Sequence, residues 1–89
     1  MNTVSINNFS FNPQVLNILP GDVVTWANND NVVHTTTSDT GVWDSGELRP
    51  GQSFQFGFSQ GGMYNYHCNV HPAMKGTISA GPAADDSPE

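Results

Sequence analysis

Apolar residues in this chain alternate with polar or small ones along several short runs. In the clearest run, Phe54, Phe56 and Phe58 are each separated by a single residue that is not large and apolar. Side chains of a β-strand point alternately to the two faces of a sheet, so this period of two predicts a strand with one buried face. Apolar positions spaced three and four apart, which would indicate an amphipathic helix, do not recur over any window of helical length. The chain is therefore predicted to be all-β.

Further runs of the same kind follow one another along the sequence, separated by residues that favour turns. The expected strand segments are Val4 to Phe11 with a bend, Leu16 to Ile18, Asp22 to Asn28, Val32 to Thr37, Phe54 to Phe58, Tyr64 to Cys68 and Gly76 to Ala80. Turn signals stand at Pro20-Gly21, Arg49-Pro50-Gly51 and Gly61-Gly62. About seven or eight short strands at near-regular spacing are typical of an antiparallel sandwich or barrel, and we expect a sandwich. Trp26 and Trp43 are expected to lie in its core or to cover a sheet.

Composition limits the kinds of protein that such a sandwich can be. The 89 residues form one domain, expected over residues 1–80, with a core small enough to give only marginal stability. The single cysteine excludes an internal disulfide, so a metal, a partner or good packing must supply further stability. The formal net charge of −6 argues against nucleic-acid binding, which needs a basic surface. No apolar run approaches the roughly 20 residues of a membrane span.

The two ends of the chain carry expectations of their own. Residues 81–89 are acidic and contain two prolines, so we expect them to be disordered or to be a trimmed linker. The first residues lack the basic start and apolar stretch of a signal peptide. Either the protein is cytosolic, or the sequence begins near a mature N-terminus, and the chemistry below favours the second interpretation.

Most of the chemical information lies in residues 62–76, GMYNYHCNVHPAMKG. Cys68, His71 and Met74 follow a predicted strand with the spacing C-x2-H-x2-M, so the loop can curl and bring their side chains together. His34 lies far upstream in the β-branched run. Each of these residues alone would most simply belong to the core or the surface. One thiolate, two imidazoles and one thioether are the ligands of a blue-copper centre, so together the four predict a mononuclear copper site.

The types of ligand favour copper over other metals. Thiolate and thioether suit Cu(I), whereas imidazole accommodates Cu(II), so the mixed set holds both oxidation states. Structural zinc sites draw on Cys and His without Met, and a single Cys argues against an iron–sulfur cluster or a dinuclear copper site with bridging thiolates. Because four protein ligands leave no position for a substrate, the site indicates electron transfer and no enzymatic activity.

The sequence resembles the cupredoxins, specifically the plastocyanin/amicyanin branch of small blue copper proteins. The likeness is strongest over residues 64–76, where YNYHCNVHPAMKG is similar to the amicyanin ligand loop, including the short gap between His71 and Met74. Weaker likeness extends over Trp26-Ala27-Asn28-Asn29, His34, Asp44-Ser45-Gly46 and Pro50-Gly51. The resemblance implies a Greek-key β-sandwich with copper near one end. It also implies one-electron transfer between larger redox proteins, with His34, Cys68, His71 and Met74 as the copper ligands.

Several neighbours of the predicted ligands can be assigned expected roles. Val33 stands where many relatives have Pro before the first ligand His, and Thr35 is expected to support the Cys68 sulfur. His67 replaces the Tyr of plant plastocyanins, as in amicyanin-like loops. Alternation directs it outward, so we expect an exposed surface residue, with a role in partner docking as the alternative. The following acidic residues are expected to be turn and surface residues: Asp22, Asp30, Asp39, Asp44 and Glu47.

The sequence thus predicts a monomeric blue copper protein that shuttles one electron between transient redox protein partners. His71, beside Pro72 and Ala73, is expected to reach the surface, where a partner can approach the metal. One alternative is a copper storage or delivery module with the same ligands, and another is a cupredoxin domain cut from a larger copper oxidoreductase. Cu(II) bound to a thiolate is expected in compartments that lack the glutathione pool, so we expect a periplasmic or other extracytoplasmic location.

Overall fold

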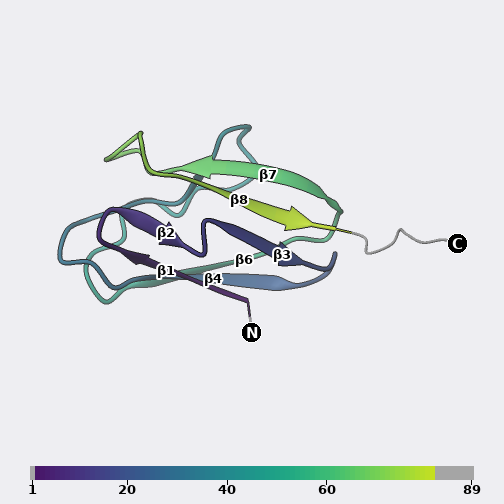
Figure 1. Cartoon of the computed structure of the whole chain (residues 1–89), viewed down its shortest axis with the longest axis horizontal. Coiled ribbons are helices and arrows are strands. Elements are labelled where there is room, and N and C mark those ends of the chain that lie inside the picture. Colours follow the sequence, from purple (N-terminus) through teal and green to yellow (C-terminus); the bar gives the residue numbers. More distant parts are fainter. Residues whose placement is uncertain (1, 82–89) are drawn as a thin grey trace, which may run out of the picture.

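A computed structural model describes residues 2–81 and shows two β-sheets packed face to face (Figure 1). Within these residues the chain forms eight strands, in the order β1 (Thr3–Asn7), β2 (Ser10–Asn12), β3 (Val15–Ile18), β4 (Val23–Asn28), β5 (Thr37–Ser38), β6 (Ser53–Gly57), β7 (Gly62–His67) and β8 (Lys75–Ala80). The all-β sandwich prediction is confirmed. No helix occurs over residues 2–81, and therefore none that is long and apolar enough to cross a membrane. Apart from Gly81, the predicted C-terminal tail lies outside the described residues.

Each sheet contains four strands, in the orders β2-β1-β4-β6 and β3-β8-β7-β5. The chain passes from one sheet to the other at every connection from β2 to β7, so most neighbouring strands are not consecutive in sequence. Of the six neighbouring pairs, β1 with β4 and β3 with β8 are parallel, whereas the remaining pairs are antiparallel. The expectation of a purely antiparallel sandwich was wrong for these two pairs.

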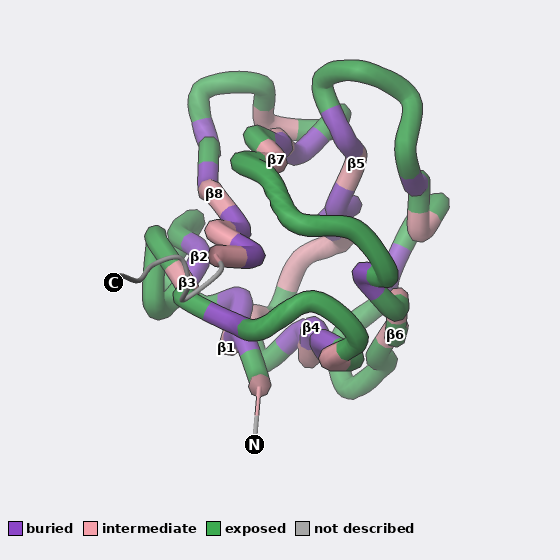
Figure 2. The backbone as a smooth tube through the Cα atoms, turned by 90° about the vertical axis from the view of Figure 1, so that its right-hand side faces the viewer, coloured by how far each residue is buried: buried purple, intermediate pink, exposed green. Residues whose placement is uncertain are grey.

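A cluster of contacting aromatic rings lies within the core between the sheets. Trp26 on β4 stacks on Trp43 with ring centroids 5.4 Å apart, and Trp43 meets Phe58 edge-on at 5.2 Å. All three side chains are buried, which confirms the prediction for the two tryptophans. Buried residues alternate with less buried ones as the period of two requires, most visibly along β8 in Figure 2. Aromatic rings therefore share the core of this small sandwich with aliphatic side chains from both sheets.

Close packing between β7 and β8 holds the strand that leads to the predicted ligand loop. Gly76 pairs with Tyr66 across these strands, and a Cβ on Gly76 would lie only 2.5 Å from the Tyr66 hydroxyl and ring. Only glycine leaves room for this ring. Burial raises the pKa of Tyr66 to about 12, because the ionised phenolate would lose its hydration. The end of β7 is thus anchored in the core immediately before Cys68.

Two predicted strand segments differ from the structure. Of the run Val32 to Thr37, only Thr37 belongs to a strand, and His34 forms an isolated bridge with Leu48. This backbone is extended but pairs with a loop instead of a regular neighbour. The segment from Val4 to Phe11 does not continue past a bend, because the chain reverses at Asn8 and Phe9 into a hairpin of β1 and β2.

Candidate metal centre

Three of the four predicted ligands converge at one end of the sandwich. Cys68 directly follows β7, His71 lies in the loop from β7 to β8, and His34 lies between β4 and β5. The Cys68 Sγ atom is 3.6 Å from His34 Nδ1 and 3.9 Å from His71 Nδ1. His34 and Cys68 are fully buried, whereas His71 is partly exposed, as predicted. The donor atoms of all three residues lie within 4.8 Å of one another.

This spacing fits a trigonal metal site. Metal–nitrogen and metal–sulfur bonds of about 2.1 and 2.3 Å that meet at about 120° place the nitrogen and sulfur about 3.8 Å apart. The two observed separations of 3.6 and 3.9 Å lie on either side of this value. One sulfur and two imidazole nitrogens form the His2Cys plane of blue-copper sites, so the residues present fit copper.

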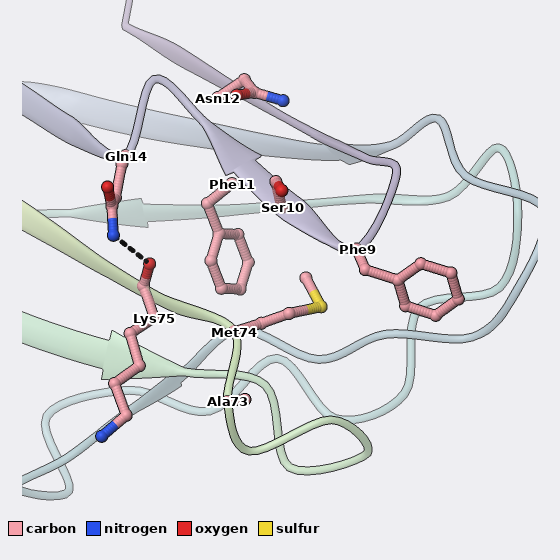
Figure 3. A pocket seen from close by; sticks show the side chains of 8 residues that line it. All are labelled: Phe9, Ser10, Phe11, Asn12, Gln14, Ala73, Met74 and Lys75. Carbon is pink, nitrogen blue, oxygen red and sulfur yellow. Dashed lines mark hydrogen bonds between the residues drawn. The ribbon is translucent and has the colours of Figure 1, made fainter.

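Met74 closes the loop that carries two of the donors. The Met74 N–H donates to the His71 carbonyl at 2.9 Å, and the Cys68 N–H donates to the Met74 carbonyl at 3.1 Å. The side chain is buried, and Figure 3 shows its sulfur directed toward the side on which Phe9 lies. These backbone bonds hold Met74 beside Cys68, and its role as axial ligand stays a prediction.

The sulfur of Cys68 receives a hydrogen bond from a second segment. The backbone N–H of Thr35 donates to Cys68 Sγ at 3.3 Å, and the Thr35 hydroxyl accepts from the Asn69 N–H at 2.8 Å. The predicted support of the sulfur by Thr35 is confirmed. This hydrogen bond fixes the position of the sulfur atom beside the two imidazoles.

Residues 1–81 match the sequence model of a family described as copper binding proteins, plastocyanin/azurin family. The chain belongs to this family. It is 30% identical over 80 residues to amicyanin from Paracoccus denitrificans, covering 84% of this chain and 61% of the relative's length. It is similar to a novel purple cupredoxin from Nitrosopumilus maritimus, with a TM-score of 0.83, 29% identity and coverage of 89% and 98% of the two chains. It is also similar to part of a copper-containing nitrite reductase from Thermus scotoductus, with a TM-score of 0.82 and 28% identity.

The shares of each relative that are covered differ widely. The chain spans almost all of the purple cupredoxin but only 61% of amicyanin. It spans 21% of the nitrite reductase chain, and that match covers 88% of this chain. Family membership and the grouped His34, Cys68 and His71 indicate a single copper ion as the cofactor of this cupredoxin. The Greek-key sandwich implied by the resemblance agrees with these structural matches.

Asp30 holds the His34 imidazole from the side opposite to Cys68. Asp30 Oδ2 lies 2.9 Å from His34 Nε2 and accepts a hydrogen bond from the Phe9 N–H at 3.1 Å. The hydrogen bond with His34 lowers the pKa of Asp30 and so keeps the carboxylate ionised. A carboxylate on Nε2 leaves Nδ1 free to face the metal. The expectation that Asp30 is only a turn and surface residue was therefore wrong.

Asn28 fixes the loop that carries both Asp30 and His34. Its buried side-chain amide donates to the carbonyls of Val32 and Leu48 at 2.9 and 2.8 Å, and its side-chain oxygen accepts from the Asp30 N–H. Sequence reasoning placed Asn28 at the end of a strand without a role at the site. Its position at the start of an Asn-Asn-Asp turn before a ligand histidine was the available signal.

His67 lies outside the donor group although it precedes Cys68 in sequence. It is partly exposed, as alternation along β7 predicted, and its ring contacts the side chains of Asp39 and Asn69. These two contacts hold the ring on the outer face of the strand. The third histidine of the cupredoxin is thus not a metal-binding candidate in this arrangement.

Replacing Asp30 with Ala is expected to weaken copper binding by roughly 10- to 100-fold, because His34 loses the group that orients its ring. Asp30→Asn keeps an acceptor oxygen and should lose less. The measurement is the copper affinity by competition with a chelator of known strength. Asp22→Ala is the matched control, because it removes one charge from a turn carboxylate that binds the Leu19 N–H. Equal affinities of Asp30→Ala and Asp22→Ala would contradict the orienting role.

Proposed function

We propose that this cupredoxin is a mononuclear blue copper protein that carries single electrons between larger redox proteins. The observation that supports this most strongly is a donor set that is buried except at one ligand. His34 and Cys68 are inaccessible to solvent, whereas His71 is partly exposed. We assign His34, Cys68, His71 and Met74 as the ligands. Copper held there supplies a one-electron couple between Cu(I) and Cu(II).

The protein keeps the ligands in one arrangement for both oxidation states. Cys68 is fixed by the end of β7 and by the Thr35 N–H, and His34 is fixed by Asp30. The hydrogen bonds between Cys68, His71 and Met74 close the ligand loop. Because these supports come from packed strands and short loops, little movement accompanies electron transfer. No enzymatic step is proposed, since four protein ligands leave no position for a substrate.

The exposed edge of His71 is the proposed point of electron entry and exit. It lies in a shallow apolar depression of about 450 Å³ that is lined by Phe9, Val70, His71, Pro72, Ala73 and Met74. Phe9 and Val70 are exposed on 50% and 43% of their surfaces. A small apolar surface beside the ligand suits short-lived contact with a redox partner. We propose that the protein works as a monomer through this surface.

The chemistry of the donor set supports an extracytoplasmic location, such as the periplasm. A thiolate beside Cu(II) is open to reaction with the glutathione pool of the cytosol. A second candidate function is that of an electron-transfer domain within a larger copper enzyme. The match to part of a nitrite reductase chain favours it, because the same fold there makes up a fraction of an enzyme.

The test is the metal content, visible spectrum and voltammetry of the purified protein. We expect one copper per chain, an intense visible band in the oxidised form and a reversible one-electron wave. Electron self-exchange, followed by NMR line broadening in mixtures of the two oxidation states, should be fast. Absence of copper or of the band would overturn the proposal. Slow self-exchange with ready release of Cu(I) would favour storage or delivery instead.

A further inference from the structure

The hairpin turn between β1 and β2 has an unusual residue at its second position. Asn8 and Phe9 are the two connecting residues, with φ angles of +53° and +57°. Turns with two left-handed residues commonly carry Asn-Gly, because an L side chain crowds the backbone in this region. Asn tolerates the conformation, whereas a residue with a bulky ring is strained in it. The structure therefore keeps a strained residue at this turn.

The Phe9 ring is not buried in the core, so core packing does not compensate this strain. Half of its surface is exposed. The ring instead meets both imidazoles of the metal centre edge-on, with centroids 5.7 Å from His34 and 5.0 Å from His71. Edge-on contacts of this kind are favourable between aromatic rings. Phe9 thus bridges two ligands that come from distant parts of the sequence.

The backbone of Phe9 is linked to the same centre. Its N–H donates to Asp30 Oδ2, the oxygen that also contacts His34 Nε2. Figure 3 shows the side chain leaving the turn on the side of the Met74 sulfur, at the rim of a pocket of about 230 Å³. One residue therefore reaches His34 through both its backbone and its ring.

We propose that Phe9 is a positioning residue of the copper site, which holds the His34 and His71 imidazoles in place and covers them from water. This inference rests on the proposed copper function. A dry environment disfavours the more highly charged Cu(II), so the cover raises the reduction potential and slows the loss of copper. The strained backbone conformation directs the ring onto both imidazoles, and strain of this kind is often retained at functional sites.

Phe9→Gly removes the ring, relieves the turn and retains the N–H that binds Asp30. Asn8→Gly is the matched control, because it relaxes the same turn and keeps the ring. We expect Phe9→Gly to lose copper to excess chelator about tenfold faster than the parent and to have a lower reduction potential. Asn8→Gly should match the parent in both measurements. The copper-free Phe9→Gly protein should be at least as stable to urea as the parent. If the two variants behave alike toward copper, the proposal is overturned.

A second measurement does not depend on copper. In the copper-free protein, ring signals of His34 and His71 should show greater mobility by NMR relaxation in Phe9→Gly than in the parent. His67 is an internal control, since its ring contacts Asp39 and Asn69 instead. Unchanged mobility of both ligand rings would overturn the positioning role. If the parent binds no copper, the proposed function fails, and this measurement alone decides the role of Phe9.

Discussion

Cys68→Ser is expected to abolish the intense visible band of the copper-loaded protein. The band arises from charge transfer between thiolate sulfur and copper, and a serine hydroxyl cannot replace that soft, ionised ligand. The affinity for copper should fall by more than the roughly 10- to 100-fold loss typical of an outer hydrogen-bonding partner. Serine is nearly isosteric with cysteine, and its hydroxyl oxygen can accept the hydrogen bond that the Thr35 N–H donates to the buried Cys68 sulfur, so the sandwich itself should persist. The measurements are the visible spectrum and a chelator competition.

Val70→Ser is the control for this substitution. Val70 lies in the same loop between Cys68 and His71 and is exposed, and it has no donor atom for copper. Its variant should retain the band. A band that survived in Cys68→Ser would show that the ligand assignment is wrong, whereas a parent protein without any band would contradict the proposed function itself.

Removing copper is expected to lower the free energy of unfolding substantially. The metal joins the segment that contains His34 to the loop of Cys68 and His71, and the unfolded chain cannot assemble this site. At free copper 1,000 times above the dissociation constant, binding to the native state alone contributes about 4 kcal/mol. For a domain of this size, that corresponds to a fall in melting temperature of about 15–30 °C on copper removal.

Circular dichroism melts of the copper-loaded and copper-free protein measure this difference. Cys68→Ser provides the control, because its melting temperature should respond little to added copper. Equal melting temperatures of the loaded and copper-free parent would show that the metal does not link the two segments. A large stabilisation of Cys68→Ser by copper would place the metal elsewhere in the chain.

The grouping of Cys68 with His71 could be predicted because its information is local. Cys68, His71 and Met74 lie within seven residues, and soft and imidazole donors at that spacing suit copper. The connection of His34 to the loop depended on donor chemistry and on the resemblance, since no spacing rule links residues so far apart in sequence. The structure then brought His34 Nδ1 to 3.6 Å from Cys68 Sγ.

The groups that surround the ligands could not be predicted in this way. Asp30 resembles any turn carboxylate in sequence, and its contact with His34 depends on a loop that the buried Asn28 amide holds. Phe9 fitted the alternation of a strand, but the chain reverses there and directs its ring to the metal centre. Ligand type and spacing are local properties of the sequence, whereas these contacts join residues that are far apart in it.

Sequence alone determined the class of fold and the chemistry of the site. Alternation reports which face of each strand is buried, and side-chain type reports which metal can be bound, and both are properties of short segments. Tertiary structure decided the parallel pairing of β1 with β4 and of β3 with β8. It also decided which side chains contact His34 and His71, because those contacts form only where loops from different strands meet at one end of the sandwich.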